Sequence, residues 1–66
     1  MKAVQCKGCR KSYPCICEID GYWAAHCMNC DVAATKQGIQ KEHSFLPMPF
    51  RSENEATTYW NKWNRR

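Results

Sequence analysis

The sequence contains no hydrophobic run long enough to cross a membrane, and its first residues do not resemble a secretory signal. Residues 1–4 lead directly into a polar, cysteine-containing segment, with no apolar stretch behind them. We therefore expect a cytoplasmic protein with no membrane association. In that compartment thiols stay reduced, so paired cysteines more often bind a metal than form disulfides.

The chain is also short. Its 66 residues make at most one domain, and such a domain buries too little apolar surface to offset its conformational entropy comfortably. Domains of this size usually need disulfide bonds or a bound metal ion for stability, and six cysteines are the candidates here. We expect residues 1–66 to form a single domain held by a metal ion.

Acidic residues are scarce, six against ten Lys and Arg, which gives a formal net charge of +4. That figure counts every cysteine as neutral. A zinc ion with four thiolates carries two net negative charges, since the ligands lose their protons on binding, and this would leave a net charge of about +2. Such a mildly basic chain does not by its charge alone indicate a nucleic-acid partner.

Two Cys-x-x-Cys turns, Cys6/Cys9 and Cys27/Cys30, have the spacing expected of a structural zinc site. Each pair wraps one turn so that both sulfurs reach the same ion, and we predict one zinc ion bound by these four cysteines. Gly8 stands where we expect the turn to need a positive φ. Four protein ligands leave no open coordination position, so the site would hold the fold and do no chemistry. We expect no enzymatic activity.

The segment between the two turns reads as a β-hairpin, because Asp20-Gly21 is a strong two-residue turn signal. A short strand follows the second turn and ends near Gly38. Residues 39–51 are predicted to be a loop, since Pro47 and Pro49 exclude a helix interior. The predicted strands cover residues 13–19, 22–26 and 32–36.

A C-terminal helix over about residues 53–64 is predicted from its start signal and its apolar face. The Ser52 hydroxyl and the Glu55 carboxylate have the spacing of a capping box, in which each reaches the other's backbone amide. We expect the helix to pack on Tyr22 and Trp23 of the hairpin. Residues at helical spacing form its predicted apolar face: Ala56, Tyr59, Trp60 and Trp63.

These elements predict a small zinc-bound α+β fold. It consists of a zinc ribbon, with a β-hairpin and a short third strand, and a C-terminal α-helix packed on it.

Cys15 and Cys17 are two residues apart on a predicted strand and so face the same way. They are extra metal ligands, or substitute ligands that compete with Cys9, or small buried apolar residues on the inner face of the hairpin, which the sequence favours. His26 directly precedes Cys27, so in an extended segment it points away from the zinc sulfurs and is a less favoured ligand. His43 lies in the polar loop and is expected to be solvated.

The chain resembles the Lar-like restriction alleviation proteins, which are small zinc-ribbon proteins of phages and prophages. The resemblance lies in the leading Cys-x-x-Cys, in Gly21-Tyr22-Trp23, in Cys27-Met28-Asn29-Cys30, and in the ending Glu55-Ala56…Trp60-Asn61…Trp63-Asn64-Arg65-Arg66. The family usually opens with Cys-Pro-x-Cys-Gly and commonly has a Gly after the second turn. Arg10 and Asp31 stand at these two positions here.

The resemblance implies a binding protein in the cytoplasm of a bacterial host cell that modulates a type I restriction–modification enzyme and spares phage DNA. Its partners would be host restriction–modification subunits, and the chain itself would be a monomer or a homodimer. A basic chain does not suit DNA mimicry, which needs a dense negative surface. Protein contact suits the aromatic residues, which are enriched at interface hot spots, and Phe45, Phe50 and Trp63 are the candidates for that contact.

The alternative is a zinc ribbon that binds nucleic acid in phage or host transcription or DNA metabolism. Basic residues cluster at the first turn and at the helix end, and they could grip phosphates if the two clusters share a face, with Tyr13 stacking on a base. The same charges are also explained as solvated residues that complement the helix dipole. The residues concerned are Lys7, Arg10, Lys11, Lys62, Arg65 and Arg66.

Overall fold

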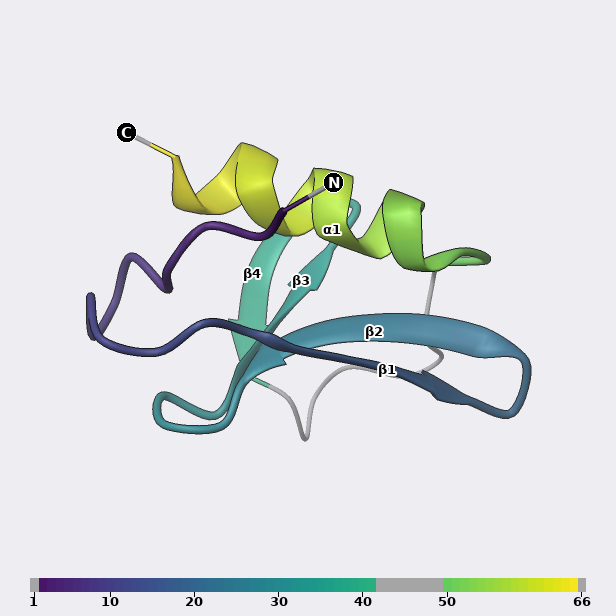
Figure 1. Ribbon diagram of the computed structural model, residues 1–66, viewed down its shortest axis with the longest axis horizontal. Helices are drawn as coiled ribbons and strands as arrows, with labels where there is room; N and C mark the ends of the chain where they lie inside the picture. The colour runs from purple at the N-terminus through teal and green to yellow at the C-terminus, as the bar shows by residue number, and fades with distance from the viewer. Residues whose placement is uncertain (1, 42–49, 66) are drawn as a thin grey trace.

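The computed structural model describes residues 2–41 and 50–65. One four-stranded antiparallel sheet, in the order β1-β2-β3-β4, carries the helix α1 across one of its faces (Figure 1). The prediction of a small α+β fold with a C-terminal helix packed on a sheet is therefore confirmed. The elements are β1 (Cys15–Ile19), β2 (Tyr22–Cys27), β3 (Val32–Thr35), β4 (Gly38–Lys41) and α1 (Glu53–Asn64).

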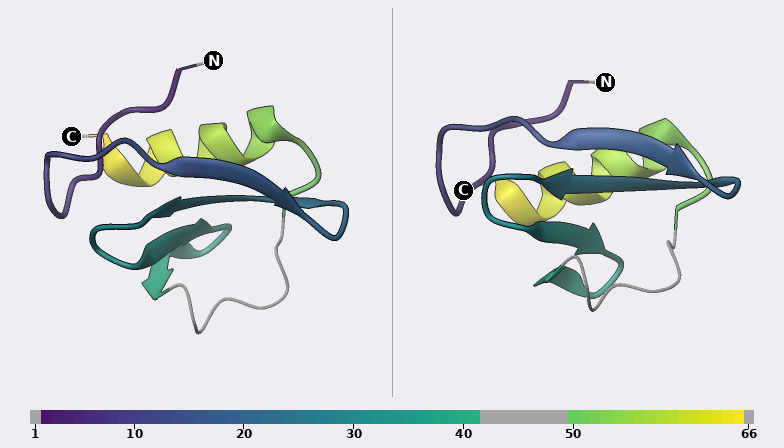
Figure 2. Two further views of the ribbon diagram at one scale, coloured as in Figure 1. Left: turned by 60° about the horizontal axis from the view of Figure 1, so that its bottom comes forward. Right: turned by 90° about the horizontal axis from the view of Figure 1, so that it is seen from below.

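The β1–β2 hairpin turns at the predicted Asp20-Gly21 pair. Both residues have a positive φ, 53° and 83°, which is the signature of a type I′ turn and matches the twist of the flanking strands. The register pairs Ile19 with Tyr22 at the turn and Cys15 with His26 at the other end. This turn lies at the end of the molecule opposite the first Cys-x-x-Cys segment (Figures 1 and 2).

The predicted loop over residues 39–51 is wrong at its start, because residues 38–41 form the strand β4. The β3–β4 turn is closed by the Thr35 hydroxyl, which donates to the Gly38 carbonyl at 2.8 Å and accepts from the Gln37 amide at 3.1 Å. An edge strand needs few apolar residues, and only Ile39 is apolar here, so the strand signal was weak. Residues 42–49 lie outside the described residues. Phe50 forms an isolated bridge with Trp23.

Helix α1 begins and ends as predicted, with Ser52 as its N-cap. The Ser52 hydroxyl accepts a hydrogen bond from the Glu55 amide at 3.0 Å. The Glu55 carboxylate reaches back to the Arg51 amide at 2.9 Å, one residue before the one that a capping box predicts. Within the described part of the chain, no helix is long and apolar enough to cross a membrane.

The buried face of α1 is rotated from the predicted one. Ala56 and Trp60 are buried as expected, whereas Tyr59 and Trp63 are only half-buried. Trp23 packs against the core, but Tyr22 is 39% exposed and does not receive the helix as predicted. The helix residues that are buried are Ala56, Thr57, Trp60, Asn61 and Asn64.

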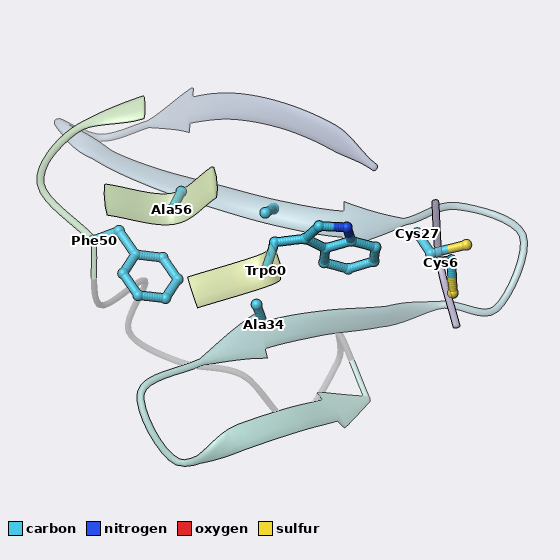
Figure 3. Close-up of a cluster of buried hydrophobic side chains, with 7 residues drawn as sticks. Cys6, Cys27, Ala34, Phe50, Ala56 and Trp60 are labelled. Carbon is cyan, nitrogen blue, oxygen red and sulfur yellow. The ribbon is translucent and has the colours of Figure 1, made fainter. Parts of the chain in front are cut away.

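The core is small and is built mostly from small side chains. Trp60 and Phe50 are its largest members, and Figure 3 shows Phe50 at one end and Cys6 and Cys27 at the other, with Trp60 between them. Because alanine and cysteine each bury little apolar area, such a core contributes little hydrophobic free energy. The remaining buried apolar residues of the described chain are Ala24, Ala25, Ala33, Ala34 and Ala56.

The N-terminal segment is hydrogen-bonded to the helix. The Asn61 side-chain amide accepts from the Val4 amide at 2.8 Å and donates to the Lys2 carbonyl at 2.9 Å. The Trp60 indole N–H donates to the Val4 carbonyl at 2.9 Å. These bonds fix the path of the chain that leads to Cys6.

Candidate metal centre

The two Cys-x-x-Cys turns have the same backbone geometry. In the first, the Cys6 carbonyl accepts from the Arg10 amide at 2.8 Å, and in the second, the Cys27 carbonyl accepts from the Asp31 amide at 2.7 Å. The residue that follows the second cysteine of each turn has a left-handed backbone conformation, with φ of 57° at Arg10 and 56° at Asp31. Each turn therefore presents its two sulfurs in the same way.

The structure brings the four predicted ligands together. The sulfurs of Cys6, Cys9, Cys27 and Cys30 all lie within 4.8 Å of one another. The Cys6–Cys30 and Cys9–Cys27 sulfur pairs are each 3.8 Å apart. A tetrahedral ion with metal–sulfur bonds of about 2.3 Å requires sulfur separations of about 3.8 Å, whereas a disulfide needs about 2.05 Å. The group thus fits one tetrahedral metal ion.

The helix also positions the first turn. The Asn64 side chain accepts from the Lys7 amide at 2.9 Å and donates to the Trp60 carbonyl at 2.8 Å. We name Trp60, Asn61 and Asn64, with their bonds to residues 2–7, the N-terminal clamp. Sequence reasoning missed the two asparagines. The signal was the repeated Trp-Asn pair, Trp60-Asn61 and Trp63-Asn64, in which an Asn directly follows each tryptophan of the helix.

Gly8 is needed for space beside the sulfurs rather than for a positive φ, so the predicted reason is wrong. Its φ lies outside the left-handed region, but a Cβ there would lie 3.3 Å from the Cys30 sulfur and 3.6 Å from the Cys6 sulfur. The first distance is shorter than an ordinary van der Waals contact. A sulfur bound to a metal cannot move aside.

Gly8→Ala is expected to weaken metal binding, because its methyl group overpacks the Cys30 sulfur. The expected loss is about 1–3 kcal/mol, typical of overpacking in a tight site. Competition with a chromogenic chelator measures it, with the exposed Lys7→Ala in the same turn as the matched control. Equal metal affinity in the two variants would contradict the role given to Gly8.

Arg10→Gly is expected to stabilise the metal-bound protein by about 1 kcal/mol, because a left-handed φ is costly for a residue with a Cβ and free for glycine. Urea unfolding in the presence of excess metal measures the change. The control is Lys11→Gly, whose φ is not positive and which should lose stability. A loss at both positions would show that backbone strain at Arg10 is negligible.

The thiols of the cluster differ in acidity. The Lys11 amide and, next, the Asn29 side chain hydrogen-bond the Cys9 sulfur and lower its pKa to about 5. Desolvation raises the pKa of Cys30 to about 12 and also raises the pKa of Cys27. Within this folded geometry the hydrogen bonds favour the thiolate form of Cys9, whereas desolvation favours the protonated forms of Cys27 and Cys30, whose protons a metal must displace.

Metal affinity is expected to fall as the pH is lowered from neutral. Cys27 and Cys30 release protons on binding, so a higher proton concentration favours the metal-free state. Metal release followed with a chromogenic chelator across pH measures this. An affinity independent of pH between 5 and 8 would contradict it.

The three aromatic candidates for partner contact differ in their exposure. Phe50 is fully buried and stacks on Tyr59 at a ring-centroid distance of 5.1 Å, so it belongs to the core and offers no surface to a partner. Trp63 is half-buried, and its indole N–H donates to the Thr35 carbonyl at 2.9 Å. Phe45 lies outside the described residues, as does His43.

Trp63 lines an apolar hollow of about 290 Å³ beside the four-cysteine cluster. Val32 and Ile39 of the sheet form its other apolar walls, and Gly8 and Cys30 lie at the cluster side. The hollow is thus built from both Cys-x-x-Cys turns, the sheet edge and the helix end.

The two basic groups meet at the same end of the molecule. Lys7, Arg10 and Arg65 line one hollow of about 370 Å³, between the first turn and the end of α1. Lys62 and Arg65 line a neighbouring hollow on the helix. Lys11 is exposed but lines neither of these hollows, and Arg66 lies outside the described residues.

Cys15, Cys17 and His26 form a second group, apart from the four-cysteine cluster. The favoured prediction, that both cysteines are buried on the inner face of the hairpin, is wrong: Cys15 is exposed, Cys17 is only half-buried, and both point away from the core that Ile16 and Ala25 face. Cys17 and His26 are half-buried.

Comparison of the chain with family models, with curated proteins and with solved structures finds no match in any of the three.

Proposed function

We propose that the four-cysteine cluster holds one structural zinc ion and that the chain acts by binding rather than by catalysis. Four thiolates at tetrahedral spacing are a ligand set that zinc prefers. Four protein ligands also leave no position at which a substrate or a reactive water could bind the ion. The zinc would hold the two turns and the helix end together.

The activity we propose is modulation of a host type I restriction–modification enzyme through protein–protein contact. Its first support is the resemblance to the Lar-like proteins. The terminal motif that carries much of this resemblance includes Trp60, Asn61 and Asn64, which form the N-terminal clamp. These three residues therefore support a shared fold, and the contact with a partner must come from residues outside the N-terminal clamp.

The observation that favours protein contact is the apolar hollow at Trp63. It lies beside the cluster, between Val32, Ile39 and the helix end. Concave apolar surface next to a half-exposed Trp is typical of the centre of a protein interface. Zinc binding would shape this hollow, because Cys30 and Gly8 are part of its wall.

Phage plating tests this proposal. Unmodified phage is plated on a bacterial host that carries a type I restriction enzyme, with and without expression of the chain. We expect expression to raise plating efficiency and Ile39→Gln in the hollow to abolish the gain, while Tyr22→Gln at the far end of the sheet leaves it unchanged. Capture of restriction subunits from nuclease-treated lysate should likewise succeed with the wild type and with Tyr22→Gln and fail with Ile39→Gln. No gain in plating with the folded wild-type chain would rule the activity out.

Nucleic-acid binding is the second candidate, favoured by the shared hollow of Lys7, Arg10 and Arg65. Phosphate-driven binding should weaken steeply with salt, by roughly 10³-fold or more across a modest range if several contacts are made. A Lys7→Glu variant should then lower affinity for every sequence alike. Binding that is insensitive to both salt and Lys7→Glu would exclude this function.

A further inference from the structure

A second group of metal-ligating side chains lies on the β1–β2 hairpin. The ligand atoms of Cys15, Cys17 and His26 all lie within 4.8 Å of one another. The register places Cys15 directly opposite His26, and Cys17 faces the same side as Cys15 because it follows two residues later on the strand. The strand ladder itself therefore brings the three side chains together.

This group lies on the opposite face of the sheet from the helix. Ala25 and Cys27 belong to the core cluster with Trp60 under α1. Because successive residues of a strand point to opposite faces, His26 between them points to the other face. The four-cysteine cluster and the hairpin group thus share no ligand, although His26 and Cys27 are neighbours in sequence.

Packing does not explain the two hairpin cysteines. Cysteines that serve as small apolar residues are usually buried, yet Cys15 is exposed and Cys17 is only half-buried. The exposure of Cys15 leaves the group accessible to an ion from solvent. The spacing of the three side chains is set by the hairpin register, since β1 pairs with β2 along its whole length.

We propose that Cys15, Cys17 and His26 form a second, solvent-open zinc site. Two thiolates and one imidazole form a known ligand set for zinc, with the fourth position left for water or for a ligand from another molecule. The two thiolates balance the charge of the ion. With three protein ligands, the site binds zinc less tightly than the four-cysteine cluster does.

The test is a metal titration of the full chain under reducing conditions, with Zn²⁺ counted by native mass spectrometry and Co²⁺ followed by absorption. The wild-type chain binds two ions, and a weak chelator removes one of them first. Cys15→Ser and Cys17→Ser each bind a single ion and keep the circular dichroism of the wild type. Ile19→Ser, an exposed change on the same strand that removes no ligand, still binds two ions.

The cobalt spectrum identifies the ligands. The second equivalent of Co²⁺ gives weaker thiolate-to-metal charge transfer than the first, because two thiolates replace four, and Cys15→Ser removes this second step. A folded wild-type chain that saturates at one ion overturns the proposal, as does a second ion that persists in the Cys15→Ser/Cys17→Ser double variant. Loss of the four-cysteine site can be told apart from loss of the hairpin site. Cys27→Ser, which removes a ligand of the four-cysteine cluster, fails to fold, whereas Cys15→Ser folds.

Discussion

Removal of the metal with a strong chelator is expected to unfold the chain. The described core contains only two large apolar side chains, Phe50 and Trp60, and most of the others are alanines. Two further core members, Cys6 and Cys27, are themselves predicted ligands. A structural zinc in finger peptides contributes roughly 10–16 kcal/mol, which is as large as the roughly 5–15 kcal/mol net stability of a typical whole domain. The fold should therefore not survive without the ion.

Far-UV circular dichroism and tryptophan fluorescence measure this unfolding, and re-addition of Zn²⁺ should restore both signals. Ca²⁺ is the control ion, because it prefers oxygen ligands and should restore neither. Cys27→Ser should behave like the chelated wild type, since Cys27 is fully buried as well as a ligand. If the chelated chain stays folded and unfolds cooperatively only when urea or heat is applied, the apolar core is sufficient to stabilise the fold without the metal.

Local signals in the sequence were enough to predict the hairpin turn, the two Cys-x-x-Cys turns and the helix. Asp20-Gly21 defines its turn through its own backbone, and Ser52 caps the helix within one turn. The spacing of the cysteines needs only the hairpin to bring them together. Each of these features depends on residues close in sequence, so periodicity and turn chemistry predict them.

The features that sequence missed depend on partners far along the chain. Asn61 and Asn64 look like surface residues of a helix, and they are buried because the N-terminal segment offers them backbone amides and carbonyls. Phe50 is buried because it pairs with Trp23 of β2, at the part of β2 that β3 is too short to reach. In each case a long-range hydrogen bond, rather than local polarity, decides the exposure of the side chain.

The residues after the two turns show how a departure from the family pattern can keep the geometry. The resemblance predicts Gly where Arg10 and Asp31 stand, and both adopt the left-handed conformation that Gly accepts most easily. Asp tolerates this conformation better than Arg does. The strain that the chain tolerates here is therefore greater at Arg10, and the hydrogen bond from the Arg10 amide to the Cys6 carbonyl holds the turn in place.

Trp60→Ala is expected to lower the free energy of unfolding of the metal-bound protein by about 3–5 kcal/mol, the range for removing a buried aromatic residue. Trp63→Ala is the matched control, because each indole N–H donates one hydrogen bond of 2.9 Å to a backbone carbonyl. Trp60 is fully buried and Trp63 is half-buried. The Trp63 variant should therefore lose only about 1–2 kcal/mol. Urea unfolding at saturating zinc measures both.

The two tryptophans should also differ in their effect on the metal. Trp60 holds Val4, two residues before Cys6, whereas Trp63 holds Thr35 at the end of β3. Trp60→Phe keeps most of the buried ring and removes the bond to Val4, so it should lower zinc affinity more than Trp63→Phe does. Equal affinities in the two Phe variants would show that the N-terminal clamp stabilises the core without positioning Cys6. A selective loss in Trp60→Phe would make the helix end part of the metal site.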